Sequence, residues 1–187
     1  ATAWAVLPIE HWTTRSGAKV VFVHAPAIPM VDIAVALDAG SRRDPPGKSG
    51  LASLTVDALD AGVPGEDEQA IAAALADVGA QRRTTVSEDR AVVALRSLTS
   101  GTELEAALRV MQRTLATPTF PAPVIARERE RIVQALREAQ TKPETQAQQA
   151  FDQLLYPSHP YGRHATPASV QSLTDADLRE FHRRHYA

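Results

Sequence analysis

Hydrophobic and polar residues alternate along several stretches of the first hundred residues, with the period of two that a half-buried β-strand requires. The clearest case is residues 31–38, in which every second residue is Val, Ile or Leu. Residues 9–14 and 19–24 are predicted as two further strands, joined by a turn at residues 15–18. Because the three strands follow one another closely, we expect them to form an antiparallel meander.

Other stretches repeat their apolar residues with the spacing of an amphipathic helix. A hairpin is predicted from the alternation at residues 80–86 and 90–98, and Ser49 and Thr174 are placed to cap the first and the last helix. Strands come first and most helices later, so we expect an α+β fold with helices packed on one face of a mostly antiparallel sheet. The helices are expected near residues 51–59, 66–78, 104–115, 125–136, 144–155 and 175–185.

Composition narrows the classes of protein that the chain can belong to. It has 187 residues, of which 44% are hydrophobic, enough for one domain with a proper core. A net charge of −2 with interspersed acids and bases gives no basic face for nucleic acid. The absence of cysteine excludes disulfides, thiolate metal sites and cysteine nucleophiles. No apolar run approaches the roughly 20 residues of a membrane span.

Three stretches of the chain carry motifs in a specific order. They are G-S-R-R-D-P-P-G-K-S-G-L-A at residues 40–52, E-R-E-R-I-V at 128–133 with K-P-E at 142–144, and H-P-Y-G-R at 159–163 with S-L-T at 172–174 and F-H-R-R-H-Y at 181–186. In this order and at this spacing they resemble the insulinase/pitrilysin peptidases, a family with an inverted zinc motif that includes mitochondrial-processing-peptidase-like proteins. The resemblance covers nearly the whole chain.

The resemblance also has implications for domain organisation. It implies that residues 1–187 form a single N-terminal peptidase-like domain. Family members usually carry two such domains in one chain, and the block that ends near Tyr186 normally continues into another strand. The resemblance therefore implies a domain truncated before its last strands, without the second homologous domain. Such a domain would leave an exposed sheet edge, which favours pairing between chains.

Active members of this family use the motif H-x-x-E-H on a helix, where two histidines grip Zn²⁺ and the glutamate acts as general base. A glutamate from another helix is the third ligand and leaves the fourth position open. The resemblance places the first histidine at Ser53, the base at Val56, the second histidine at Asp57 and the distal glutamate at Ala135. These side chains are unsuited to those roles. We therefore expect no catalytic residue, no metal ligand and no cofactor in this chain, although the family cofactor is zinc.

Four missing groups on an otherwise intact framework favour a non-catalytic homologue. Inactive chains of this family commonly pair with an active zinc-bearing chain, so the resemblance implies a heterodimer that forms a peptide-degrading or peptide-processing chamber. Self-association is the other pairing that it allows. Two alternatives stay open: an active zinc metallopeptidase with shifted ligands, drawn from Asp57, Glu138 and a histidine, and a purely structural assembly subunit. The resemblance allows an exported bacterial protein of the periplasm, and the cytoplasm is not excluded.

Three further patterns have an ordinary structural interpretation beside a functional one. The tripeptide G-K-S at residues 47–49 resembles the end of a phosphate loop, but the first glycine of that motif would fall at Arg42, which disfavours nucleotide binding. His182 and His185 could share a metal, although a surface or capping role is more common for such a pair. The alternating charges of residues 127–131 favour a solvated helix face with ion pairs over a partner surface.

Overall fold

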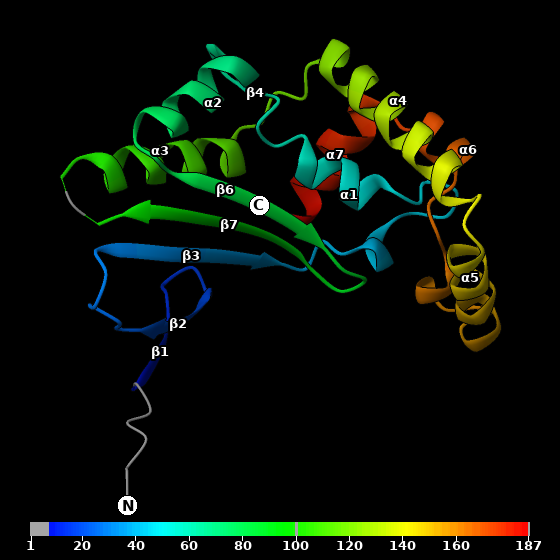
Figure 1. Ribbon diagram of the computed structural model, residues 1–187, viewed down its shortest axis with the longest axis horizontal. Coiled ribbons are helices and arrows are strands. Elements are labelled where there is room, and N and C mark those ends of the chain that lie inside the picture. Colours follow the sequence, from blue (N-terminus) through cyan, green and yellow to red (C-terminus); the bar gives the residue numbers. More distant parts are fainter. Residues whose placement is uncertain (1–7, 100, 187) are drawn as a thin grey trace, which may run out of the picture.

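The computed structural model describes residues 8–99 and 101–186, in which a layer of helices covers one face of a curved sheet (Figure 1). The sheet contains β3 (Met30–Leu37), β7 (Ala91–Leu98) and β6 (Gln81–Val86) in that order, and both neighbouring pairs are antiparallel. The expected α+β class is confirmed. No helix in the described part of the chain is long and apolar enough to cross a membrane.

The helices follow the predicted order, and the hairpin formed by β6 and β7 is also where the alternation places it. Five short elements were not predicted: α6, the two 3₁₀ turns, and the two-residue strands β4 (Gly62–Val63) and β5 (Glu66–Asp67), which pair with each other. The α-helices are α1 (Leu51–Asp57), α2 (Glu68–Asp77), α3 (Glu103–Ala116), α4 (Ala122–Ala139), α5 (Pro143–Leu155), α6 (Pro167–Gln171) and α7 (Asp175–His185), with 3₁₀ turns η1 (Ser41–Arg43) and η2 (Pro160–Gly162).

The predicted antiparallel meander is confirmed for its first two strands, which pair with each other, and is wrong for the third. Strands β1 (Ile9–Thr13) and β2 (Lys19–Val23) form a separate two-stranded sheet, while β3 pairs with β7, which comes from much later in the chain. Every second residue of β7 is buried, so β7 takes the central place in the sheet and leaves β3 at its edge. Alternation identifies a strand and its buried face, but it does not identify the neighbour.

The main core lies between the sheet and the helices. Helix α1 is at its centre, because five of its seven residues are buried. Each large apolar side chain buried in this way contributes about 1.5–3 kcal/mol to folding. The largest fully buried apolar side chains are Phe120, Leu54, Leu59, Ile71, Leu95, Leu173, Leu178, Val56, Val93, Val133 and Val170.

Capping of the first helix differs from the prediction, while capping of the last helix is confirmed. Ser49 does not cap α1: the N-cap residue is Gly50, with a φ of 101° and no side-chain cap. The carboxylate of Asp44 accepts hydrogen bonds from the amides of Gly50 and Ala52, both at 2.8 Å. The bend at residues 44–50 brings this carboxylate back to amides six and eight residues further along the chain. Thr174 forms the expected capping box at α7.

Candidate functional site

Helix α1 carries three of the four positions at which the family motif would stand. Ser53 is half-buried, Val56 is only 1% exposed, and Asp57 is exposed. Val56 belongs to the hydrophobic core. The position that the resemblance assigns to the general base is therefore filled by a branched hydrocarbon side chain that packs into the protein.

Polar groups at the C-terminal end of α1 connect the helix to strand β6. The Thr84 hydroxyl donates a hydrogen bond to the Asp57 carboxylate at 3.0 Å. Arg82, whose side chain is 9% exposed, forms an ion pair with Asp60 at 2.8 Å and donates to the carbonyl of Val56 at 3.3 Å. A cation is favourable at the end of a helix, where carbonyl groups lack partners. These side chains anchor the helix to the strand.

The end of helix α7 meets the same region. Burial raises the pKa of the Tyr186 hydroxyl, the charge of Asp57 raises it further, and the charge of Arg82 opposes both. The Tyr186 ring stacks on His182 at a centroid distance of 5.1 Å. The Nε2 atom of His182 forms a hydrogen bond of 2.8 Å with the carbonyl of Leu115. An aromatic and hydrogen-bonded contact thus accounts for one member of the histidine pair.

The second member of that pair, His185, has different neighbours. Its ring lies 4.6 Å from the ring of Phe181, centroid to centroid. Burial lowers the pKa of His185, the charge of Arg43 lowers it further, and Asp38 opposes this shift. The two histidines are therefore engaged in separate contacts.

The fourth position of the family motif lies on α4. Ala135 is exposed, and Glu138, one turn further on, is also exposed and lies 3.8 Å from the ammonium group of Lys142. One hydroxyl, one exposed carboxylate and two hydrocarbon side chains do not fit a tetrahedral zinc site, which needs at least three donors of the right kind. Within residues 8–99 and 101–186, no three His, Cys, Asp or Glu side chains are grouped so that they could hold a metal ion.

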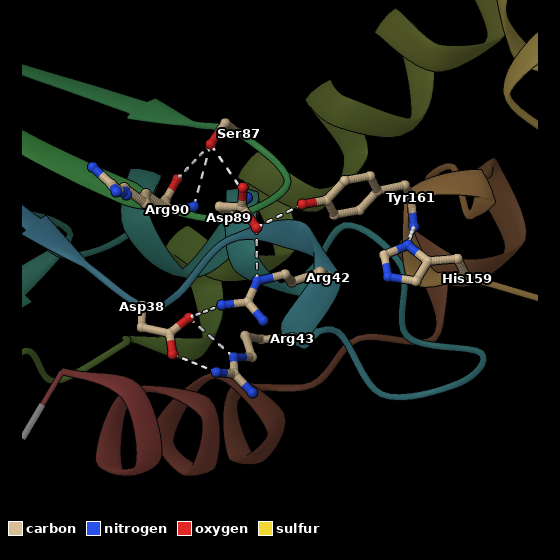
Figure 2. Close-up of polar contacts among 8 residues, drawn as sticks. All are labelled: Asp38, Arg42, Arg43, Ser87, Asp89, Arg90, His159 and Tyr161. Carbon is tan, nitrogen blue, oxygen red and sulfur yellow. Dashed lines mark hydrogen bonds and ion pairs between the residues drawn. The ribbon is translucent and has the colours of Figure 1, made fainter. Parts of the chain in front are cut away.

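Figure 2 shows a polar network that joins the first motif to the third. Arg42 forms ion pairs with Asp38 at 2.7 Å and with Asp89 at 2.9 Å. The Tyr161 hydroxyl donates to Asp89 at 2.8 Å, and this bond raises the pKa of Tyr161. A hydrogen bond from Arg43 holds the pKa of Asp38 below its usual value. The segment that leads into α1 and the segment after α5 are thus fixed to the turn between β6 and β7.

The remaining charged motifs also make structural contacts. The ammonium group of Lys48 donates to the carbonyl of Ser172 at 2.8 Å and to Asp177 at 2.9 Å. Arg127 of α4 makes two hydrogen bonds to Glu68 of α2, at 2.8 and 2.7 Å. Arg129 donates to the carbonyl of Leu173 at 2.7 Å. The charged face of α4 therefore binds neighbouring elements, beyond the pairs within one helix that the sequence predicts.

Asp44, Arg82 and Thr84 make contacts at this site that the sequence analysis did not single out. Asp44 lies inside the first motif, but only the fold brings its carboxylate onto α1. For Arg82 a signal exists, because alternation along β6 places it on the same face as Thr84 and Val86, toward the helices. A charged residue on the inner face of a strand requires a partner, and Asp60 is that partner.

Comparison with known proteins identifies the family to which this fold belongs. The model of the family "Insulinase (Peptidase family M16)" matches residues 19–167. The chain belongs to this family. An inactive domain of an M16 peptidase from Pseudomonas fluorescens is 35% identical and covers 94% of this chain and 43% of its own, with a TM-score of 0.89. The chain thus spans less than half the length of that relative. No curated protein matches.

More distant M16 structures share the fold. A protease from Helicobacter pylori is 21% identical over 95% of this chain and 43% of its own, with a TM-score of 0.81. Pitrilysin is 19% identical over 99% of this chain and 20% of its own, also with a TM-score of 0.81. The M16 fold of the chain is thus retained even where few residues are identical.

Proposed function

We propose that this chain is a non-catalytic member of the M16 family that pairs with an active, zinc-bearing member to form a peptide-degrading or peptide-processing chamber. The observation that carries the proposal is the state of α1. The helix is packed in the core and its first amides donate to Asp44, while Val56, at the position that the resemblance assigns to the general base, is buried. Side-chain general-base catalysis contributes typically 10²–10⁴-fold and cannot come from a hydrocarbon.

The sheet edge beside α1 supports a role in peptide binding. Strand β6 pairs with β7 on one side, and within the described residues no strand pairs with its other side. The same strand holds α1 through Thr84 and Arg82. An extended peptide can add to such an edge through main-chain hydrogen bonds. This chain would then contribute a wall of the chamber and the partner would contribute the metal and the base.

The relative from P. fluorescens also supports the proposal, because that protein is an M16 inactive domain and is 35% identical to this chain. An assembly experiment provides the test. The protein is co-expressed with a relative that has an intact H-x-x-E-H motif. We expect the two to co-purify, and peptide cleavage to be faster than with the relative alone.

A matched partner variant locates the catalytic groups. If the motif glutamate of the partner is replaced by glutamine, the complex should form but cleave nothing. Cleavage by that complex would contradict a non-catalytic role. Association without any effect on cleavage rate or peptide preference would favour the purely structural assembly subunit, and absence of association would refute the pairing.

The alternative of shifted ligands makes a different prediction. It requires Asp57 and Glu138 to bind zinc together with a histidine, although Asp57 accepts a hydrogen bond from Thr84 and Glu138 lies beside Lys142. Metal analysis of the purified chain separates the two proposals. Stoichiometric zinc that is lost in the variant Asp57→Asn would establish shifted ligands, whereas we expect no bound zinc in either protein.

A further inference from the structure

Helix α5 turns its polar side toward the protein and its apolar side toward solvent. No residue of the helix is buried. The partly buried positions are Thr145, Gln149 and Asp152, which follow one another at the spacing of one helix face. In Figure 1 the helix lies at the far end of α4, away from the helix layer that covers the sheet. This arrangement is the reverse of an ordinary surface helix.

The opposite face of α5 carries an exposed apolar stripe, formed by Ala147, Ala150, Phe151, Leu154 and Leu155. Phe151 is 59% exposed, Leu154 83% and Leu155 54%. The two alanines are exposed as well and precede the large residues by one turn. Exposed apolar patches of this kind typically mark interaction sites. The stripe thus has small residues in its N-terminal half and large residues in its C-terminal half.

Contacts at the C-terminal end hold α5 without using the stripe. The turn η2 packs so closely that a Cβ atom on Gly162 would lie 2.3 Å from the carbonyl oxygen of Tyr156. Asp152, on the inner face, lies 3.5 Å from the Nε2 atom of His164. The position of the helix is therefore set by its polar face and its end, and the stripe is left available for a partner.

The charges on α5 indicate the chemistry of that partner. The helix contains no Lys or Arg, which a helix that binds a membrane surface usually carries on its polar face. Of its two acids, Asp152 faces the protein and Glu144 lies in the first turn, away from the large residues. An uncharged apolar stripe selects another uncharged apolar surface, and it meets no like-charge repulsion when it pairs with itself.

We propose that the stripe binds a second copy of this chain, by antiparallel pairing of the two α5 helices about a two-fold axis. A two-fold interface brings one surface onto itself, so its two halves must be complementary. Antiparallel pairing places Leu154 on Ala147 of the other copy and Phe151 on Ala150, large on small in both places. Parallel pairing would place large residues on each other. In the antiparallel arrangement Glu144 lies opposite Pro157 and meets no acid.

The size of the surface sets the expected strength of the dimer. An apolar hollow of about 540 Å³ continues the stripe beyond the helix end and is lined by Leu155, Tyr156, Pro157, Ser158, His159 and Tyr161. Even with the hollow, the surface comprises about ten residues, whereas a standard interface uses about 20–30 residues from each partner. We therefore expect a reversible dimer with a dissociation constant in the micromolar range or weaker.

Sedimentation equilibrium of the 187-residue chain over a wide concentration range tests the pairing. The wild-type chain should pass from monomer to dimer as its concentration rises. The variant Leu154→Glu should remain monomeric, because it places a charge in the stripe at a position too exposed to affect folding. The matched control Gln153→Glu adds the same charge beside the stripe and should dimerise like the wild type.

A crossed pair of variants tests the antiparallel register. Leu154→Glu and Ala147→Lys should each be monomeric alone, and their equimolar mixture should form a heterodimer in which the two charges meet. Three outcomes would each overturn the proposal: a wild-type chain that stays monomeric up to its solubility limit, a Leu154→Glu dimer as strong as wild type, and binding of the stripe to lipid vesicles in place of dimerisation. The test does not depend on catalysis or on an active partner, so it is independent of the proposed function.

Discussion

Helices α1 and α5 of the same chain differ in how their side chains are packed. Five of the seven residues of α1 are buried, whereas none of the thirteen residues of α5 is. Asp44 reaches the first turn of α1 from outside the helix, and the first turn of α5 has no side-chain cap. Short helices are marginal in water and depend on tertiary packing. The first helix obtains that packing within the domain, and the second presents an apolar face that a partner can cover.

The comparison separates two requirements that coincide in an active enzyme. In a zinc peptidase the motif helix must both fold the domain and hold the metal. In this chain α1 is packed through residues such as Leu54 and Val56, while the positions that the resemblance assigns to ligands and base carry unsuited side chains. Packing alone is therefore sufficient reason for the helix to exist. Packing within the domain does not explain α5 in the same way, because none of its residues is buried. Contact with a partner would explain it.

The largest expected effect comes from truncating one leucine in each helix. Leu54→Ala should lower the free energy of unfolding by about 2–5 kcal/mol, because Leu54 is fully buried and its removal leaves a cavity. Leu154→Ala should change it by less than about 0.5 kcal/mol in the monomer, since that side chain is 83% exposed. Urea denaturation at low protein concentration measures both. Equal losses would remove the distinction between the helices.

A pH-dependent effect is expected at α1. Burial raises the pKa of Asp44 to about 6 from 3.8, while the amides of Ala52 and Gly50 and the charge of Arg163 oppose the shift. The protonated form is thus favoured in the folded state. The resulting stability is present below pH about 4 and is lost as the pH rises through 6, by an amount on the order of 3 kcal/mol.

Comparison with the variant Asp44→Asn isolates this contribution from other carboxylates. The stability of the wild-type chain relative to the variant should decrease between pH 4 and pH 7.5, as measured by urea denaturation at each pH. A difference that is constant with pH, or that increases, would show that the amides govern the carboxylate more strongly than burial does.

Removing the Asp44 side chain, which caps α1, should lower the stability by a smaller amount. Asp44→Ala should cost about 1 kcal/mol at neutral pH, the usual value for the loss of an N-cap side chain. Ser49→Ala is the matched control and should cost less than about 0.5 kcal/mol, because the Ser49 side chain does not cap α1. Thermal unfolding of the three proteins would show this. A larger loss of stability in Ser49→Ala than in Asp44→Ala would show that Ser49 caps α1, as the sequence predicts.

The smallest effect is expected at the inner face of α5. Asp152→Asn weakens the contact with His164, which joins two partly exposed side chains at 3.5 Å. Polar contacts of this kind between partly exposed side chains contribute at most about 1 kcal/mol. Denaturation of this variant should therefore resemble the wild type closely. A loss comparable to that of Leu54→Ala would mean that α5 belongs to the cooperative core.

Sequence patterns predicted the kind of element much better than its partners. Alternation was sufficient to predict β3, and helical spacing was sufficient to predict α3, because local periodicity shows which face of an element is buried. The pairing of β3 with β7 was missed, since it depends on which of several strands occupies the centre of the sheet. The motif positions Ser53 and Asp57 were located by resemblance, yet the resemblance gave no information about Thr84, which binds Asp57 across the fold.

The burial of Val56 restricts how the chain could change in future. A return to the family motif would have to introduce a carboxylate at a position that is 1% exposed. Burying an unpaired charge lowers stability by several kcal/mol. Zinc binding could offset this loss only after the other three side chains had also been replaced by ligands. The change at Val56 alone would therefore weaken the fold before any activity appeared, whereas Asp57 and Ala135 are exposed and could change with little loss of stability.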